Sequence, residues 1–284
     1  MADAVGVGSR VVSVRRLGGG GWHANHAVDV VDRRGEKHRL VLRRWARPGW
    51  EILDPDFNAH RELATYRLLA ESDVPAPRLV AADPDVEACD VPALLITRLR
   101  GRQPRAPREM RAFLAQLASA LVPIHAVDAT AAAGVPAYRR YHETTTLAAP
   151  AWASNPRVWT RAIEAVTRAE PSGRRSFIHR DYHPGNTLWS RGRLTAVVDW
   201  TSGSVGSPAV DTGHMRWNLA VEYGLDAADQ FLELYREVMD EPVEDQPYWD
   251  LVTAYDVAAG DMSSSPREEL LRLEQHVAAA VARV

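Results

Sequence analysis

Hydrophobic and polar residues alternate along the first hundred positions in the way that β-strands require. Runs rich in valine or leucine are separated by turns rich in Gly, Pro and Asp, which is typical of an antiparallel sheet. Strands are predicted at 10–16, 27–31, 39–45, 79–82 and 93–97. One amphipathic helix is predicted at 57–71, where Leu63, Tyr66 and Leu69 recur at helical spacing.

Beyond residue 110 the apolar residues recur with the period of helices. Helices are predicted at 110–127, 159–169, 212–223, 226–239, 247–260 and 266–284. Residues 129–156 lack a clear period and are predicted to be loop with short helices, and residues 202–208 to be loop. A strand-rich front part therefore precedes a helical back part.

The chemistry is concentrated in residues 177–200, FIHRDYHPGNTLWSRGRLTAVVDW. A short apolar run leads into a polar loop broken by Pro-Gly, and a β-branched run then ends on Asp199. The loop matches the H-R-D-x-x-x-x-N pattern of kinases. Asp181 would orient and deprotonate an attacking hydroxyl, while Asn186 and Asp199 would supply the oxygen ligands that Mg²⁺ prefers.

Two other interpretations of this stretch are open. Asp, Asn, Pro and Gly are common turn residues, so the loop could be a plain turn. Alternatively, His179, Asp181, His183 and Asp199 could be ligands of a hydrolytic metal centre. The metal-centre interpretation leaves Asn186 without a role. The complete eight-residue pattern, followed by a strand that ends on Asp, favours the kinase interpretation over a plain turn.

The segments HRDYHPGNTLW, VVDW and VGSPAVDTGHMRWNLA resemble the aminoglycoside phosphotransferase family, the small-molecule relatives of protein kinases that include choline and homoserine kinases. Asp-Trp-Thr stands where protein kinases have Asp-Phe-Gly. The resemblance implies an α+β, bilobal, protein-kinase-like fold. Residues 1–98 would form a nucleotide-binding lobe with an antiparallel sheet and one helix, and residues 99–284 a mostly helical lobe with the catalytic loop and the acceptor site. It also implies a structural role for Asp211.

The glycine run between the first two strands suits a hairpin that covers phosphates, because backbone amides approach phosphates only where no Cβ intervenes. Gly19, Gly20 and Asn25 are therefore assigned to nucleotide binding. The segment LLITRLRG resembles the interlobe hinge of kinases, where backbone groups of Thr97 to Leu99 would bind the purine. Backbone contacts depend little on side chains, so the donor is ATP or GTP.

The third strand carries an arginine where a kinase has its phosphate-binding lysine. Arg43 is the predicted residue, and Arg44 is the alternative because a one-residue slip reverses the face of a strand. A guanidinium grips phosphate oxygens in a fork. The family resemblance implies that a carboxylate on the following helix fixes this cation; Glu62 is predicted, with Glu71 as the alternative.

Charge and composition limit the kinds of ligand and partner that the protein is expected to bind. The net charge is −3, yet residues 201–284 hold 16 acidic and five basic side chains, so residues 1–200 carry about +8. A basic front part suits a polyphosphate, and an acidic back part would attract a cationic acceptor, although solvated helices explain the same counts. Nothing resembles a nucleic-acid surface, and no apolar run nears the roughly 20 residues of a membrane span. A cytoplasmic protein is expected, and the single Cys89 excludes an internal disulfide.

The sequence thus predicts an enzyme, a small-molecule O-phosphotransferase that moves the γ-phosphoryl group of ATP or GTP to a hydroxyl in a Mg²⁺-dependent reaction. An antibiotic such as an aminoglycoside, a macrolide or another natural product is the first choice of acceptor. A metabolic acceptor such as choline, homoserine or a sugar is the second. A nucleotide-binding pseudokinase that acts as a regulator is the third interpretation, and Asp181, Asn186 and Asp199 together argue against it.

Overall fold

The computed structural model describes residues 4–18, 23–47, 49, 57–128, 134–142, 146–239, 246–260, 262 and 264–284. Backbone contacts divide the chain into two compact units. The first comprises Met1–Arg102, Asp128–Pro136 and Thr187–Gly203, and the second Gln103–Val127, Ala137–Asn186 and Ser204–Val284. Each unit draws on several segments of the chain, and the predicted lobes 1–98 and 99–284 stay a prediction.

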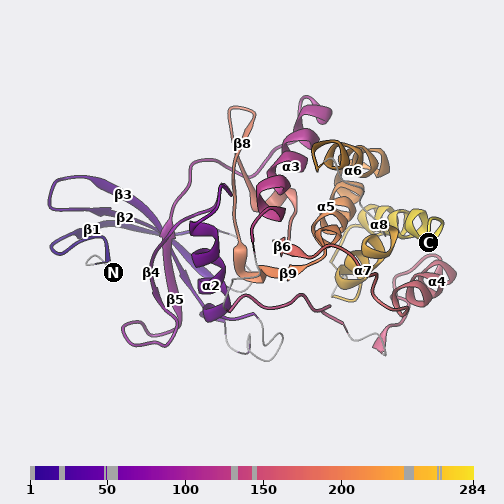
Figure 1. Cartoon of the computed structure of the whole chain (residues 1–284), viewed down its shortest axis with the longest axis horizontal. Coiled ribbons are helices and arrows are strands. Elements are labelled where there is room, and N and C mark those ends of the chain that lie inside the picture. The colour runs from indigo at the N-terminus through magenta and orange to yellow at the C-terminus, as the bar shows by residue number, and fades with distance from the viewer. Residues whose placement is uncertain are drawn as a thin grey trace. The chain divides into compact units, whose positions relative to one another are not determined.

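The first unit is built on a five-stranded antiparallel sheet. Its strands are β1 (Arg10–Arg16), β2 (Ala24–Val31), β3 (Lys37–Arg44), β4 (Leu79–Asp83) and β5 (Ala93–Thr97), in the spatial order β1-β2-β3-β5-β4. Helix α2 (Ala59–Ala70) lies against β4 and β5 (Figure 1). Val28, Val30, Leu40 and Leu95 form a buried cluster on the sheet, so the alternating pattern reports the buried face correctly.

Helix α2 begins at a side-chain cap. Asn58 precedes its first turn with an extended backbone, and its side-chain oxygen accepts a hydrogen bond of 3.0 Å from the Arg61 N–H. Such a cap satisfies one of the N–H groups that a helix start leaves without a partner. The helix therefore begins at Ala59 rather than at the predicted residue 57, and it ends at Ala70, one residue before the predicted end.

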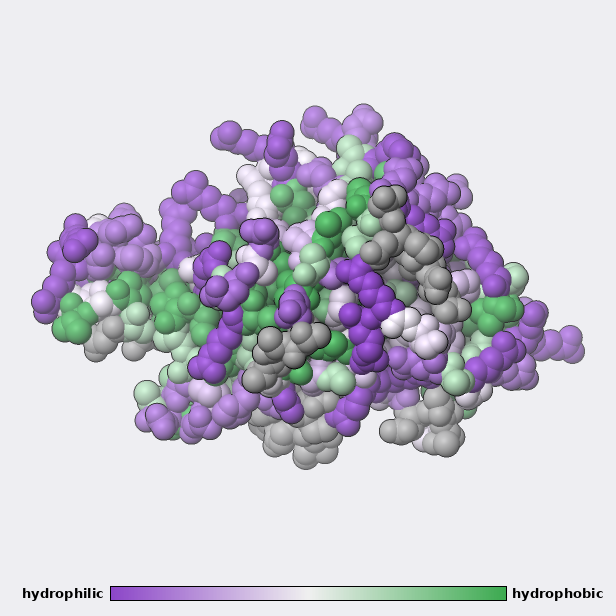
Figure 2. Space-filling model, viewed as in Figure 1, coloured by the Kyte–Doolittle hydropathy of each residue, from purple (hydrophilic) through white to green (hydrophobic). Residues whose placement is uncertain are grey.

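The outer strand β1 is exposed along its whole length. Val11, Val12 and Val14 are each more than 40% exposed, and hydrophobic surface is visible over the strands at the left of Figure 2. Arginines at 10, 15 and 16 flank these valines, and charged residues on an edge strand oppose pairing with another chain.

The first unit also contains the hairpin of β7 (Thr187–Ser190) and β8 (Arg193–Val197), followed by the 3-10 helix η4 (Trp200–Ser202). This is the apolar run that was predicted to end on Asp199. Helix α2 contacts η4. The segment after the hairpin is thereby placed beside the helix that carries Glu62.

The second unit is mainly helical. Its helices are α3 (Met110–His125), α4 (Pro156–Val166), α5 (Pro208–Tyr223), α6 (Leu225–Met239), α7 (Gln246–Ala258) and α8 (Arg267–Val281). Helix α5 packs against α6, α7 and α8, while α3 packs against α6 and α4 against α8 (Figure 1). Trp159, Trp249 and Leu273 belong to its buried core. None of the described helices is long and apolar enough to cross a bilayer.

The boundaries of two predicted elements are corrected by the structure. Residues 202–208 were predicted to be loop, but β9 (Ser204–Gly206) pairs antiparallel with β6 (Ser176–Ile178). The three residues of β9 carry too short a pattern to be recognised as a strand. Helix α5 starts four residues earlier than predicted, because Ser207 caps it and Pro208 occupies its first turn. The predicted α+β class is confirmed.

Candidate functional site

The predicted catalytic loop of the second unit leaves β6 and ends in the 3-10 helix η3 (Pro184–Asn186). Its backbone is left-handed at Arg180, where φ is +69°. Residues other than glycine adopt this conformation rarely and at an energetic cost. Neighbouring groups must therefore hold the loop in place.

Asp211 on α5 supplies that restraint. Its carboxylate accepts hydrogen bonds from the backbone N–H of His179 at 2.9 Å and of Arg180 at 2.7 Å, and it lies 3.0 Å from Nε2 of His125. Asp211 is wholly buried. A buried carboxylate is stable when several donors satisfy it. These contacts agree with the structural role that the resemblance implies for Asp211.

Asp181 follows this restrained segment, and donors from two elements hold its carboxylate. The side-chain amide of Asn186 donates to Oδ2 at 2.9 Å, and His214 Nε2 on α5 lies 3.1 Å from Oδ1. The Asp181 side chain is 39% exposed. Burial acts to raise the pKa of Asp181, but the hydrogen bond with His214 and the imidazoles of His183 and His179 hold that pKa well below its usual range.

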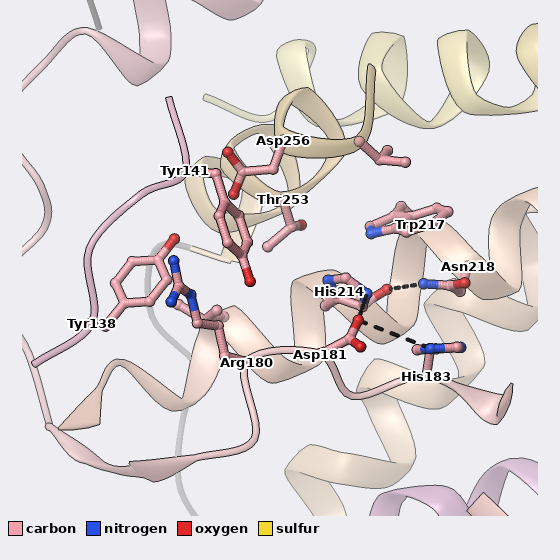
Figure 3. A pocket seen from close by; sticks show the side chains of 12 residues that line it. Tyr138, Tyr141, Arg180, Asp181, His183, His214, Trp217, Asn218, Thr253 and Asp256 are labelled. Atoms are coloured by element: carbon pink, nitrogen blue, oxygen red, sulfur yellow. Dashed lines mark hydrogen bonds and ion pairs between the residues drawn. The ribbon is translucent and has the colours of Figure 1, made fainter. Parts of the chain in front are cut away.

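The Asp181 side chain faces a cavity of about 300 Å³ (Figure 3). Small-molecule sites span roughly 300 to 1,000 Å³. Aromatic and ionisable side chains line this cavity, namely Tyr138, Tyr141, Arg180, His183, His214, Trp217 and Asp256. The wall is suited to a ligand with both an apolar face and polar groups.

Arg180 and Asp256 both line the cavity. The Arg180 guanidinium stacks over the Tyr141 ring, 4.0 Å from its centroid, and donates to the Arg139 carbonyl at 2.8 Å. Burial raises the pKa of Asp256 to about 7, although Arg180 and His214 oppose the rise. The cavity thus holds a carboxyl group that titrates near neutral pH.

In the first unit, Arg43 is the centre of a buried polar cluster. Its Nε lies 2.7 Å from Oε1 of Glu62, and its Nη2 donates to Oδ1 of Asp199 and to Oγ1 of Thr201, both at 2.8 Å. The ring of His23 is 3.3 Å from the same Nη2. Arg43 is 6% exposed and Glu62 is wholly buried. The structure therefore brings three predicted residues together: Arg43, Glu62 and Asp199.

Protonation in this cluster reflects burial and charge together. Burial alone would lower the pKa of the Arg43 guanidinium, but Glu62 and Asp199 raise it above its usual value. Burial raises the pKa of Glu62 to about 7 against the attraction of Arg43. Burial, followed by Arg43, lowers the pKa of His23 to about 3. A neutral His23 therefore lies beside a charged Arg43 at physiological pH.

The alternatives to Arg43 and Glu62 lie elsewhere. Arg44 forms an exposed ion pair with Asp90, with Nη2 2.6 Å from Oδ2. Glu71 is exposed at the C-terminal end of α2. In the register of the sheet Asn25 is the partner of Arg43, so a second predicted nucleotide-binding residue lies beside it. Gly19 and Gly20 lie outside the described residues.

The predicted hinge follows β5. The Thr97 N–H donates to Arg78 and the Arg98 N–H to Arg39, each at 2.8 Å. The Leu99 N–H has no backbone partner among the described residues. Of the predicted segment, the Leu99 N–H is therefore the candidate donor for a purine contact.

The residues predicted to hold a metal offer suitable donors. Asp199 has a left-handed backbone, with φ of +67°, a conformation that often marks a functional site. Its carboxylate and the amide oxygen of Asn186 are hard oxygen donors of the kind that Mg²⁺ binds. In contrast, His179, Asp181 and His183 do not form a set of ligand atoms within 4.8 Å of one another. Among the described residues of the second unit, no cluster of three ligand side chains supports the alternative hydrolytic centre.

The cavity contains functional candidates that the sequence analysis missed. His214 lies three residues after Asp211, and this spacing places both on one side of a helix. That signal was available once Asp211 was known to face the loop. Tyr138, Tyr141 and Asp256 come from distant segments without a motif, and only the tertiary structure unites them.

A model of the phosphotransferase enzyme family matches residues 13–274. Similar solved structures include macrolide 2'-phosphotransferase MphH from Brachybacterium faecium, with 20% identity, a TM-score of 0.59, and 98% of this chain and 95% of that chain covered. A thermostable variant of aminoglycoside phosphotransferase APH(4)-Ia with ADP and hygromycin B has 16% identity, a TM-score of 0.65, and coverage of 96% and 94%.

Amicoumacin kinase hAmiN, solved with AMP-PNP, Ca²⁺ and Ami, has 13% identity, a TM-score of 0.60, and coverage of 95% and 88%. At such identities structural likeness shows a shared fold. The predicted kinase-like fold is thereby confirmed. No curated protein matches the chain.

Proposed function

The chain belongs to the phosphotransferase enzyme family, and we propose that it moves the γ-phosphoryl group of ATP or GTP to a hydroxyl of a small molecule. The family membership confirms the resemblance of the catalytic-loop sequence, and with it the predicted enzyme class. The donor, the acceptor and the roles of individual residues belong to the proposal.

The observation that carries the proposal is the placement of Asp181. It follows a loop that Asp211 restrains, its carboxylate is fixed by Asn186, and it faces a cavity large enough for a small molecule. A base must lie within hydrogen-bond reach of the hydroxyl that it deprotonates. In the reaction the acceptor oxygen would bond to the γ-phosphorus, the bond to the leaving nucleoside diphosphate would break, and Asp181 would take the proton.

The donor phosphates would be held by residues of the first unit. Arg43 offers a guanidinium that Glu62 fixes in place, and a cation aimed at phosphate oxygens stabilises the charge that develops during transfer. Asn186 and Asp199 would be ligands of Mg²⁺, which neutralises phosphate charge when bound. Asn25 and the hairpin glycines Gly19 and Gly20 would contact the phosphates, and backbone groups of Thr97 to Leu99 the purine.

An antibiotic is the first candidate for the acceptor. Solved structures with the same fold include enzymes named for aminoglycosides, macrolides and amicoumacin. The cavity joins the aromatic rings of Tyr141 and Trp217 to the carboxyl group of Asp256. Such a wall suits the sugar face and the amines of a hydroxylated, cationic natural product.

A metabolic alcohol is the second candidate, and the size of the cavity favours it. A volume of about 300 Å³ is at the lower end of the range for small-molecule sites. An acceptor the size of one sugar ring, or of choline or homoserine, fits this volume better than a large macrolide.

Phosphoryl transfer to a mixed panel tests both candidates. The protein is incubated with ATP or GTP and Mg²⁺, together with antibiotics and metabolic alcohols, and mass spectrometry detects any acceptor that gains a phosphoryl group. The Asp181→Ala variant is the blank. An acceptor modified only by the wild type supports the proposal, while modification by both proteins removes Asp181 from the mechanism. Absence of transfer together with no nucleotide-dependent rise in melting temperature would contradict the proposed activity.

A further inference from the structure

Hydrogen-bond donors hold both oxygens of the Asp181 carboxylate. Asn186 belongs to the same loop and donates to Oδ2 at 2.9 Å, whereas His214 reaches Oδ1 at 3.1 Å from the middle of α5. Figure 3 shows the His214 ring directed at this oxygen. An ionised carboxylate has about four lone-pair sites, so two contacts fix its orientation and leave sites for an acceptor hydroxyl.

The same helix also fixes the loop backbone. Asp211, one turn before His214, accepts the N–H groups of His179 and Arg180. Residues three apart on a helix are neighbours on its surface. Helix α5 thus holds the loop at two points, through its backbone at Asp211 and through the Asp181 side chain at His214.

We propose that His214 is a positioning residue of the phosphoryl transfer, whose Nε2–H holds Oδ1 of Asp181 in the orientation that receives the acceptor's proton. The inference rests on the proposed function, in which Asp181 is the base. His214 neither contacts the donor phosphates nor takes part in bond formation. It acts through Asp181, by restricting the rotation of a side chain that is 39% exposed.

Other groups near Asp181 do not supply this restraint. Nε2 of His183 lies 3.9 Å from Oδ1, which exceeds hydrogen-bond distance. His179 accepts the Asp181 backbone N–H at 3.3 Å and so orients the main chain. Arg180 stacks on Tyr141. Among the described side chains outside the loop, His214 is therefore the one within hydrogen-bond distance of the Asp181 carboxylate.

The ring of His214 is itself held in place. It packs edge-on against Trp217, with centroids 5.2 Å apart, and lies 5.9 Å from the ring of His183. Its side chain is 18% exposed. A restrained ring loses little further freedom when it holds the base, and misplacement of a catalytic group by about 1 Å can cost on the order of 100-fold in rate.

The test compares His214→Ala, which removes the donor, with His214→Gln, which keeps an N–H donor on a side chain of similar reach. His60→Gln is the matched control, because His60 is exposed on α2 and outside the proposed site. The probe is ATP with Mg²⁺ and water as the phosphoryl acceptor, followed as phosphate release. For each protein kcat and the KM for ATP are measured, and a nucleotide-dependent melting shift confirms that the variant is folded.

For His214→Ala we expect kcat to fall by on the order of 100-fold with the KM for ATP unchanged. His214→Gln should recover most of the loss, and His60→Gln should match the wild type. A structural role would lower the melting temperature of both His214 variants without separating their kcat values. If His214→Ala does not fold, His214→Asn takes its place, because its shorter amide falls short of Oδ1.

The outcomes separate this inference from the proposed function. If the wild type releases phosphate and His214→Ala matches it, the positioning role is overturned while the activity stands. Equal losses for Ala and Gln also overturn it. If the wild type neither releases phosphate nor binds ATP, the proposed function fails, and the inference fails with it.

Discussion

Removal of the Glu62 carboxylate is the most direct test of the cluster around Arg43. In Glu62→Ala the ion pair of 2.7 Å disappears, and a guanidinium that is 6% exposed loses its buried partner. Asp199 and Thr201 still accept from Nη2 at 2.8 Å. The Arg43 guanidinium therefore remains buried with two of its hydrogen-bond acceptors, but without the carboxylate of Glu62.

The expected loss of stability in Glu62→Ala follows from this arrangement. Breaking a buried ion pair by removing one partner costs about 3–5 kcal/mol, because the other charge remains buried. Asp199 remains 2.8 Å from the guanidinium, so the lower end, about 3 kcal/mol, applies to Glu62→Ala. At about 2 °C per kcal/mol for a chain of this size, the melting temperature should fall by about 6 °C.

Differential scanning calorimetry at pH 8 measures this effect. Burial raises the pKa of Glu62 to about 7, so its carboxylate is ionised in the wild type at pH 8. Glu71→Ala is the matched control, since Glu71 lies at the exposed end of the same helix. The melting temperature of Glu71→Ala should equal that of the wild type. We also expect the Glu62 variant to need a higher ATP concentration for the same melting shift, because Arg43 is less well fixed.

A second variant distinguishes an orphaned charge from a simple cavity. Replacing Arg43 by Met and Glu62 by Leu together removes both charges at similar volume, and such replacements are often neutral or stabilising. The double variant should therefore melt above Glu62→Ala. The reasoning is refuted if Glu62→Ala melts within about 1 °C of the wild type, or if the double variant melts lower than it.

Three further predictions concern single side chains. Asp211→Asn should lower the free energy of unfolding by about 2–3 kcal/mol and reduce kcat, because the charge-assisted bonds to two loop N–H groups are weakened. Calorimetry measures the first effect and phosphate release the second. Unchanged values would show that Asp211 does not restrain the loop. Asp256 has a pKa of about 7 when folded and about 4 when unfolded. The folded protein thus keeps a proton that the unfolded chain releases, and wild-type stability declines as pH rises from about 4 to about 7. Asp256→Asn should melt above the wild type at pH 8, with the gap closing at pH 4; a gap independent of pH would disprove the shift. Arg44→Ala should leave both the melting temperature and the KM for ATP unchanged, since its pair with Asp90 is exposed, and a raised KM would move the phosphate-binding role to Arg44.

The predictable part of the fold had strong local signals. The strands carry a period of two and the helices a period of 3.6, and both depend on burial of one face. The pairing of Glu62 with Arg43 was predicted and is present at 2.7 Å. The family resemblance implied that a helix carboxylate fixes this cation, and Glu62 was preferred to Glu71 because it leads the apolar face of α2.

The walls of the cavity could not be predicted, for a physical reason. Tyr141 lies in an irregular segment, Trp217 on α5 and Asp256 on α7. No spacing along the chain links them, because their proximity depends on how helices pack. The strand β9 was missed for a related reason: its three residues are fixed by pairing with β6 rather than by their own pattern.

The packing of α5 explains why a loop motif alone does not make this site. The sequence HRDYHPGN supplies Asp181 and Asn186, yet the conformation of the loop depends on Asp211, which is wholly buried 31 residues beyond Arg180. Without a carboxylate there, the N–H groups of His179 and Arg180 would lose their acceptor, and the left-handed residue would lose its restraint. Because His214 follows on the same helix, any change that shifts α5 must move both the loop backbone and the base. The proposed catalytic geometry therefore depends on the packing of α5 as well as on the loop sequence.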